Sequence, residues 1–376
     1  MNAIQRDSGH NKNPLPSVSY SPIDQAYSNL GSARALAVAV QFGVFTHIAE
    51  GKRTVAQIAH DARASERGMQ RLLNVLVSLH FLTKWGDTYE LTPVASEYLV
   101  RGKPFYVGLL MEGDWLWESW GRLFETVRTG TPFRHVDEAT EEATQFFKAL
   151  IPTLHVVNLP GARCAASLLL RGGAPSEDLQ VLDIACGSAV WSIAIAEAAG
   201  SSTRVIAQDL PNVLELTRKY LRLHGVENQY EFWPGDQRKL DFGANRFDLA
   251  IIARYLHELG AEAACDLFRR VFTALKPGGR IAVADWMPNN ERTGPPGPLL
   301  YALRMLLHTH HGDAHTGEDY MRWLGSVGFT EIELTPDIGA DIPLITGTKP
   351  NHEGRLWAES AARGETGWPV QTRKLT

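Results

Sequence analysis

Residues 182–196, LDIACGSAVWSIAIA, decide the fold, because an apolar strand is followed by a turn of small residues and then by an apolar helix. Further apolar runs typical of buried strands follow at residues 204–207, 247–252 and 280–284, with helical stretches between them. Strands that alternate with helices predict an α/β fold with a doubly wound, mostly parallel sheet. Residues 332–334 and 343–345 predict two late strands, which suit an antiparallel hairpin at one edge.

Composition bounds the class of protein. The chain has 376 residues, of which 44% are hydrophobic and 21% charged, as in ordinary globular proteins. The formal net charge of −5 disfavours nucleic acid and anionic membranes as partners. No apolar run approaches the roughly 20 residues of a membrane helix, and residues 1–19 lack a signal core. The three cysteines have no metal or redox spacing, so we expect a cytoplasmic protein.

Residues 21–103 predict a small helical domain that ends in a hairpin. Thr54 and Ser65 are suited to cap two helices, and the Gly-Asp pair at 86–87 is typical of a tight turn between strands. Helices followed by a hairpin predict a winged helix, an arrangement that can bind DNA. The last helix is too apolar for that role, so we expect it to pack against a protein surface such as a second subunit. Its predicted apolar side is formed by Leu72, Val75, Leu76, Leu79 and Phe81.

Five segments are expected along the chain. A flexible tail at residues 1–20 precedes the winged-helix domain at 21–103. Residues 104–170 are helical and rich in aromatic side chains, which predicts a helical linker that contributes to a substrate pocket. The α/β domain spans residues 171–349, and an extension without an assigned role spans 350–376. Side chains that could bind a flat apolar substrate, or else belong to the core, are Trp115, Phe147, Leu154, Tyr301, Met305 and His308.

Polar residues follow the predicted strands at the edge of the sheet where ligands bind in open α/β folds. The second strand ends at Asp209, whose carboxylate could accept hydrogen bonds from both hydroxyls of a ribose. Asp236 and Gln237 form a further polar point, placed to meet an adenine. The G-x-G-x-x-G fingerprint and the P-loop motif are both absent from the sequence. This disfavours a nicotinamide cofactor or a nucleoside triphosphate as the ligand of this site.

The chain resembles the small-molecule S-adenosylmethionine-dependent O-methyltransferases that carry an N-terminal winged-helix dimerisation domain, such as plant caffeate enzymes and bacterial antibiotic-tailoring enzymes. The resemblance covers roughly residues 22–349 and is carried by LDIACGSAVWSIAIA, AQDLPNVLE, WPGDQRKLDF, ARYLHELG, LKPGGRIAVADWMP and GEDYMRWLGSVGF. It implies a Rossmann-like catalytic domain, a homodimer and a small-molecule substrate. It also implies S-adenosylmethionine as the cofactor, with contacts from Asp183, Gly187, Asp209, Leu210, Asp236, Gln237 and Arg254.

The sequence departs from the family pattern at three places. The glycine-rich loop keeps one glycine, Gly187, with alanines at neighbouring positions. Ala253 stands where the family has a lysine, four residues before its catalytic histidine. A second family acid, aligned near Ala314, is missing.

His257 is the candidate general base, because it follows the strand 247–252 at the predicted catalytic edge. An imidazole with an ordinary pKa of about 6.5 can take a proton from a phenol or acidic hydroxyl near neutrality. By the resemblance, Asp285 lies beside that histidine and would orient it. We therefore expect methyl transfer to a hydroxyl of an aromatic or polyketide-like natural product.

The histidine-rich segment 308–315 leaves two alternatives open. It is most simply a polar helix end whose histidines bind substrate or solvent. In the first alternative, His257 with His308 or His310 holds iron or zinc and assists methylation at carbon of a 2-oxo acid or enolate. In the second, the chain is a relative that does not methylate but catalyses hydroxylation, decarboxylation or rearrangement.

Overall fold

The computed structural model describes residues 18–136, 140–171, 178–339 and 341–351. The chain divides into two compact units, Met1–Lys103 and Pro104–Thr376. Most of the predicted tail and nearly all of the C-terminal extension therefore lie outside the described residues. Among the described helices, none is both long and apolar enough to cross a membrane.

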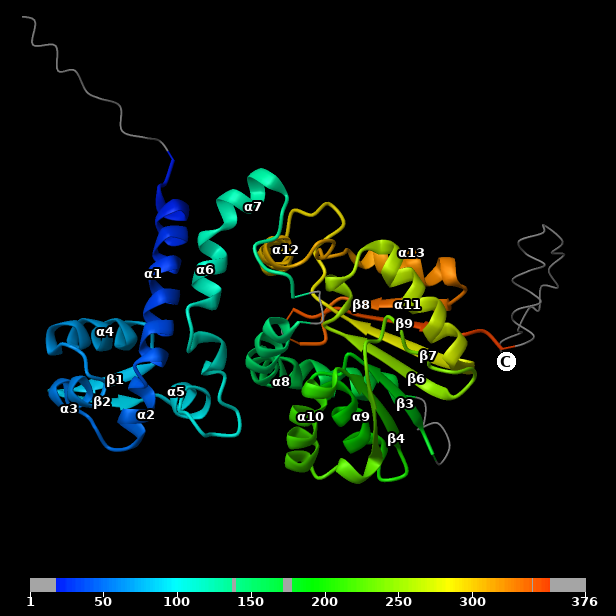
Figure 1. Ribbon diagram of the computed structural model, residues 1–376, viewed down its shortest axis with the longest axis horizontal. Helices are drawn as coiled ribbons and strands as arrows, with labels where there is room; N and C mark the ends of the chain where they lie inside the picture. The colour runs from blue at the N-terminus through cyan, green and yellow to red at the C-terminus, as the bar shows by residue number, and fades with distance from the viewer. Residues whose placement is uncertain (1–17, 137–139, 172–177, 340, 352–376) are drawn as a thin grey trace, which may run out of the picture. The chain divides into compact units, whose positions relative to one another are not determined.

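The N-terminal unit has the predicted helices followed by a hairpin (Figure 1). Thr54 accepts a hydrogen bond from the Gln57 backbone N–H and Ser65 one from the Gly68 N–H, so both predicted caps are confirmed. The antiparallel strands pair in register around Gly86, whose φ of +56° suits a tight turn. The elements are α1 (Ser21–Gln41), α2 (Val44–Ala49), α3 (Val55–Asp61), α4 (Glu66–Ser78), β1 (Leu82–Trp85), β2 (Thr88–Leu91) and α5 (Pro93–Tyr98).

The buried face of α4 differs from the predicted one. Met69, Leu73 and Leu76 are buried, whereas Val75 is 40% exposed. The prediction included Leu76 but left out Met69 and Leu73, and the residues that face the core of this unit follow the helical spacing i, i+4 and i+7 from Met69. Val75 belongs instead to a set of exposed apolar side chains in the unit, with Ile23, Tyr27, Leu30 and Trp85.

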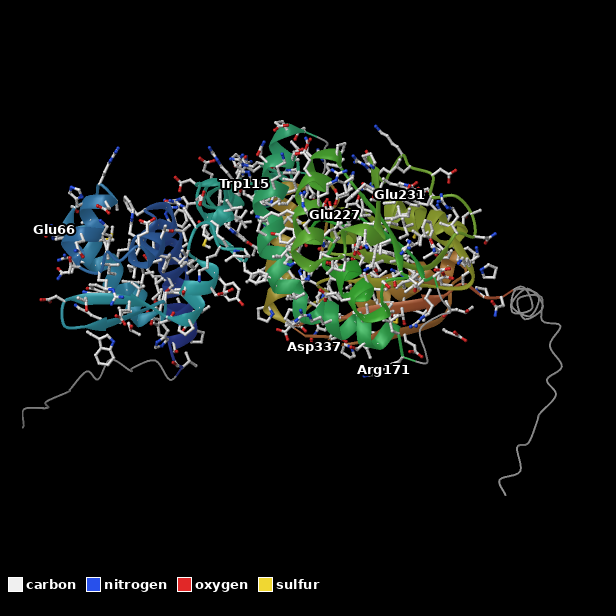
Figure 2. The ribbon with its side chains drawn as sticks, turned by 90° about the horizontal axis from the view of Figure 1, so that it is seen from below. Glu66, Trp115, Arg171, Glu227, Glu231 and Asp337 are labelled. Atoms are coloured by element: carbon white, nitrogen blue, oxygen red, sulfur yellow. The ribbon has the colours of Figure 1, made fainter. Side chains whose placement is uncertain are left out.

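The second unit begins with helices. These are a short 3-10 helix η1 (Gly108–Met111), α6 (Trp115–Gly121), α7 (Leu123–Thr129) and the long α8 (Glu141–Leu169). Trp115, labelled in Figure 2, starts α6 and stacks on Phe146 of α8 with 4.2 Å between ring centroids. Val136, Ala143 and Leu150 complete this small apolar cluster beside the sheet domain's own core.

A seven-stranded sheet follows, with the order β5-β4-β3-β6-β7-β9-β8. Its strands are β3 (Gln180–Ile184), β4 (Arg204–Asp209), β5 (Tyr230–Pro234), β6 (Phe247–Ala253), β7 (Leu275–Ala284), β8 (Thr330–Thr335) and β9 (Leu344–Thr348). β3 to β7 are parallel, and β9 pairs antiparallel with both β7 and β8. The doubly wound sheet and its late antiparallel hairpin are confirmed, and the edge strand β5 joins the four predicted buried runs.

Alternation along the strands produces two core layers. Leu182, Ala250 and Ile281 belong to one apolar cluster with α11 (Ala261–Ala274) and α13 (Gly317–Val327). Their neighbours Val181, Leu249 and Ala282 belong to another with α8 and α9 (Val190–Ala199). Successive side chains of a strand point to opposite faces, so each face carries its own helices, as Figure 1 shows. The remaining elements are α10 (Pro211–His224), α12 (Pro296–His308) and the 3-10 helices η2 (Glu227–Gln229) and η3 (Leu256–Glu258).

The chain order reverses between β3 and β6. From β3 the chain proceeds outward through β4 and β5, then crosses back to place β6 on the other side of β3. Loops after the two central strands therefore diverge and leave a crevice beyond their carboxyl ends. Asp209, His257 and Asp285 lie at this edge.

Candidate active site

The loop between β3 and α9 has an unusual backbone. Gly187 has a φ of +55°, and Ala185 and Ala189 have φ values of +52° and +58°. A left-handed conformation costs an L-residue roughly 1–2 kcal/mol, so the two alanines hold strained positions that glycine would occupy freely. The loop thus keeps the backbone path of a glycine-rich turn although it contains only one glycine.

Asp209, the last residue of β4, fastens this loop. Its Oδ2 accepts a hydrogen bond of 2.8 Å from the Gly187 N–H, and its Oδ1 accepts one of 2.7 Å from the Leu210 N–H. Burial raises the pKa of this carboxyl to about 6, although the two backbone hydrogen bonds favour the ionised form. Asp183 lies deeper, where its Oδ2 accepts a 2.5 Å hydrogen bond from Ser192 and burial raises its pKa to about 7.

A cavity of about 260 Å³ opens beside these residues, lined by side chains of the β3, β4, β5 and β6 ends and of α8 and α12. Its walls bring together most of the predicted cofactor and acceptor residues. They include Phe147, Leu154, Gly187, Asp209, Leu210, Asp236, Gln237, Arg254, His257, Tyr301, Met305 and His308. Asp183, Asp285, Trp115 and His310 are not among the lining residues, and Trp115 packs behind Phe146 and His308.

His257 is held from both ring nitrogens. Its Nδ1 lies 2.8 Å from Asp285 Oδ1, and its Nε2 lies 2.8 Å from the Tyr301 hydroxyl. Because Asp285 can only accept, Nδ1 carries the proton of the neutral ring and Nε2 accepts from Tyr301. Burial lowers the pKa of His257, and the neighbouring Asp285 only partly opposes this. The ring is thus kept neutral, with a basic nitrogen at the cavity.

Asp285 is the centre of a buried network at the end of β7. Besides His257 Nδ1, it accepts hydrogen bonds from the His257 and Trp286 backbone N–H groups, from Tyr320 and from Arg254 Nη1 at 3.3 Å. Burial alone would raise its pKa, but His257 and Arg254 outweigh that effect and lower it to about 2. Asp285 is therefore a carboxylate that orients the imidazole.

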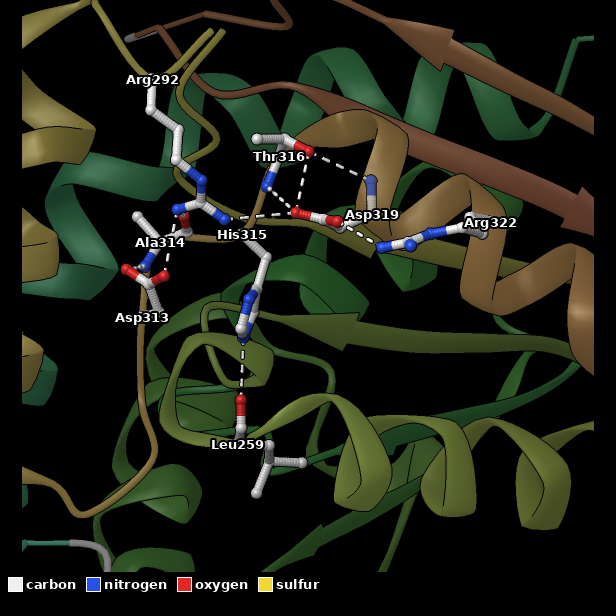
Figure 3. Close-up of polar contacts among 8 residues, drawn as sticks. All are labelled: Leu259, Arg292, Asp313, Ala314, His315, Thr316, Asp319 and Arg322. Atoms are coloured by element: carbon white, nitrogen blue, oxygen red, sulfur yellow. Dashed lines mark hydrogen bonds and ion pairs between the residues drawn. The ribbon is translucent and has the colours of Figure 1, made fainter. Parts of the chain in front are cut away.

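The segment where the family has its second acid is occupied by structural contacts (Figure 3). Arg292 donates to Asp313 at 3.0 Å and to the Ala314 carbonyl at 2.9 Å, and it also pairs with Asp319. His315 Nε2 lies 2.8 Å from the Leu259 carbonyl, which ties the segment to the loop after His257. Tyr301, which sequence analysis placed only in the acceptor pocket, supplies the second hydrogen bond to His257 instead.

The rings of His308 and His310, the two other histidines of the metal alternative, contact aromatic side chains other than His257. His310 stacks on His135 with 4.5 Å between centroids, and His308 lies 4.5 Å from the Trp115 ring. In the part of the chain that the structure describes, no three His, Cys, Asp or Glu side chains gather as metal ligands would. The geometry thus gives no support to the metal-assisted alternative.

One prominent residue of the cavity wall, Arg304, was not predicted from the sequence. The signal was present, because this arginine interrupts the otherwise apolar run from Leu299 to Leu307 on α12. A charged residue on the buried side of an apolar helix marks a functional position.

Comparisons with known proteins agree with this geometry. A methyltransferase domain matches residues 181–279, and an O-methyltransferase dimerisation domain matches residues 28–101. The tetracenomycin polyketide synthesis 8-O-methyl transferase TcmO of Streptomyces glaucescens is 29% identical over 329 residues, covering 85% of this chain and 93% of its own. A 3-hydroxy-5-methyl-1-naphthoate 3-O-methyltransferase of Streptomyces sahachiroi is 24% identical, covering 81% and 88%. The structure of human N-acetylserotonin methyltransferase in complex with S-adenosylmethionine superposes with a TM-score of 0.74, at 26% identity and 90% and 100% coverage.

The sheet order, the crevice at its switch point and the acid after β4 define a Rossmann-like methyltransferase that uses S-adenosylmethionine. The residues fit this cofactor, because Asp209 can accept from ribose hydroxyls and the small side chains at 185–189 allow close approach to the backbone. The chain is an S-adenosylmethionine-dependent methyltransferase that combines a methyltransferase domain with an O-methyltransferase dimerisation domain, and it is similar to O-methyltransferases over most of its length.

Proposed function

We propose that the chain methylates a hydroxyl group of a small aromatic or polyketide-like molecule, with His257 as the general base. The observation that carries the proposal is the buried Asp285–His257 pair, whose Nε2 is directed to a cavity with apolar walls. By their names, TcmO acts in the synthesis of a polyketide and the Streptomyces sahachiroi enzyme acts on a hydroxynaphthoate, which supports an aromatic or polyketide-like substrate here.

The cofactor, when bound, supplies a methyl group on a positively charged sulfur. His257 Nε2 accepts the proton of the acceptor hydroxyl, and Asp285 stabilises the resulting imidazolium through Nδ1. The acceptor hydroxyl replaces the Tyr301 hydroxyl at Nε2, because one lone pair serves one donor at a time. Phe147, Leu154 and Met305 orient an aromatic ring and exclude water from the site.

For the cofactor end of the cavity, we assign Gly187, Asp209, Leu210, Asp236 and Gln237 as binding residues. Asp183 does not line the cavity, and in this proposal it supports the cofactor site indirectly by accepting a hydrogen bond from Ser192 on α9. Arg254 contacts Asp285 and lies over Trp286, which places it beside His257.

We also propose a homodimer built on residues 21–103. Ile23, Tyr27 and Leu30 recur on one side of α1 and are more than half exposed. Exposed apolar side chains at this spacing are typical of a helix that packs against another chain. The segments 104–170 and 171–349 would then form the pocket wall and the catalytic domain, which agrees with the cavity residues on α8.

The function is tested by incubating the protein with S-adenosylmethionine and a set of hydroxynaphthalenes and hydroxyanthraquinones. We expect one equivalent of S-adenosylhomocysteine for each methyl ether formed. A product methylated at carbon would contradict the O-methyl assignment. Altered acceptors without S-adenosylhomocysteine would instead indicate the non-methylating alternative.

Cofactor affinity is expected to fall in mild acid. The carboxyl of Asp209 has a pKa raised to about 6, so it is a full acceptor above that pH and becomes protonated below it. The dissociation constant for S-adenosylmethionine should therefore increase as pH falls from 7.5 to 5, by at most about tenfold per pH unit below 6. Calorimetric titration measures this, with Asp209→Asn as the control that binds weakly and with little pH dependence. A constant affinity across this range would show that Asp209 does not hold the ribose.

A further inference from the structure

Arg304 on α12 lines the cavity, yet one edge of its guanidinium meets no acceptor among the described residues. Its Nε and Nη2 are both buried, and no hydrogen bond reaches either atom there. Its guanidinium carbon Cζ lies 5.5 Å from the centroid of the Phe146 ring and 5.7 Å from that of Tyr301. The neighbours of the guanidinium group are therefore aromatic rings. Burial lowers the pKa of this guanidinium, which remains charged near neutrality.

Two more donors of the same wall also lack acceptors among the described residues. Arg254 is buried and gives Nη1 to Asp285, but its Nε has no hydrogen bond. His308 is buried with neither ring nitrogen hydrogen-bonded, and burial lowers its pKa to about 3, so the ring is neutral and offers one N–H. Buried donors without acceptors are rare in proteins, and each costs free energy until an acceptor arrives.

The charge balance of the cavity also favours an anion. Asp285 compensates Arg254 and is already shared with His257, so it is committed at the back of the site. Glu258 lines the cavity as well, and Asp209 and Asp236 lie at its cofactor end. The cofactor, when bound, would add the positive charge of its sulfonium to this cavity, and a neutral acceptor would leave Arg304 buried without a counter-charge.

We propose that the methyl acceptor is an aromatic acid whose carboxylate pairs with the Nε–Nη2 edge of Arg304. This edge presents two parallel N–H groups that match the two oxygens of a carboxylate. Arg254 and His308 line the same cavity and supply further donors without acceptors among the described residues. The inference rests on the proposed function only in taking the bound acid to be the molecule that is methylated.

The test uses calorimetric titration of protein saturated with S-adenosylhomocysteine, with 1-naphthoate and the isosteric 1-naphthamide as probes. We expect the acid to bind about tenfold or more tightly than the amide, because a bidentate pair with a charged group is the stronger contact. Arg304→Gln should remove most of that preference while leaving amide affinity within about twofold. Arg304→Lys keeps the charge but loses the two parallel N–H groups of the guanidinium, so its preference for the acid should lie between those of the wild type and Arg304→Gln.

Arg269→Gln on α11 is the matched control, since Arg269 is exposed and pairs only with Asp266 among the described contacts. It removes the same charge from the protein and should leave the acid preference intact. Equal affinity for acid and amide, or no measurable binding of either probe at millimolar concentration, would overturn the proposal.

A transfer assay separates this inference from the proposed function. Methylation of a hydroxynaphthoate and of its methyl ester at equal kcat/KM would exclude the carboxylate site while the O-methyltransferase proposal stands. If the protein bound the acid selectively but methylated no hydroxyarene, the carboxylate site would be supported and the proposed O-methyltransferase reaction would be contradicted.

Discussion

Replacing His257 with alanine is expected to lower the rate of methyl transfer by about 10²–10⁴-fold, the usual contribution of a positioned general base. Affinity for S-adenosylmethionine should remain nearly unchanged, because the hydrogen bonds of His257 go to Asp285 and Tyr301 rather than to the proposed cofactor residues. The pair of measurements is a single-turnover rate and a calorimetric dissociation constant for the cofactor.

His311→Ala is the control for this variant, since His311 lines the same cavity and is absent from the proposed machinery. It should retain most of the activity. A His257→Ala protein that keeps more than about a tenth of the wild-type rate would refute the assignment of the base.

The pH profile provides a second test of His257. Burial lowers its pKa below the ordinary value, so the ring stays neutral and basic at pH values where an exposed histidine is already protonated. The wild-type rate should therefore hold as pH falls through about 6.5. The same shift favours unfolding in acid, because the unfolded histidine takes up a proton first. A rate that halves near pH 6.5 would indicate a solvated base instead.

Substituting Asp285 with asparagine is expected to affect both activity and stability strongly. Asparagine can present its amide N–H₂ to His257 Nδ1, which moves the ring proton to Nε2 and removes the base. It also leaves Arg254 buried without its carboxylate partner. We expect the rate to fall by about 10²-fold or more and the free energy of unfolding to drop by roughly 3–5 kcal/mol.

Urea unfolding and single-turnover rates measure these two effects, with Asp266→Asn as the control on the exposed surface of α11. The pKa of Asp285 is about 2 in the folded protein, below its ordinary 3.8. Its stabilising contribution is therefore complete above pH 4 and lost as pH falls through 2, and the Asn variant should lack this acid-dependent step. Wild-type stability and rate in Asp285→Asn would show that the buried network has no role.

Much of the fold could be predicted from the sequence, because its signals are local. Apolar runs of five or six residues separated by helical stretches predicted the parallel strands, and Thr54 and Ser65 predicted helix starts that the structure confirms. The buried face of α4 was predicted less well. Apolar residues such as Val75 lie off the face that packs in this unit, and the sequence does not say which face meets the rest of the unit.

In the candidate site, too, some residues could be predicted from local sequence and others could not. The placement of Asp209 and His257 at one edge could be predicted, because each lies at the carboxyl end of a strand and these ends meet at one edge of the sheet, and the family resemblance added Asp285. The contact of Tyr301 with His257 joins residues 44 positions apart, and Arg304 reaches the same cavity from one helical turn later on α12. These contacts depend on how α12 packs over the sheet.

By itself, the sequence determined the order of strands and helices, which follows from periodicity. The resemblance of its motifs to a known family implied the cofactor class and the His257–Asp285 pair that we propose for the proton transfer. Only the tertiary structure decided which groups surround that pair: the Tyr301 hydroxyl at His257 Nε2, and an arginine edge without an acceptor among the described residues. The physical reason is that hydrogen-bond partners and burial are properties of side chains from separate elements, and they exist only once those elements have packed.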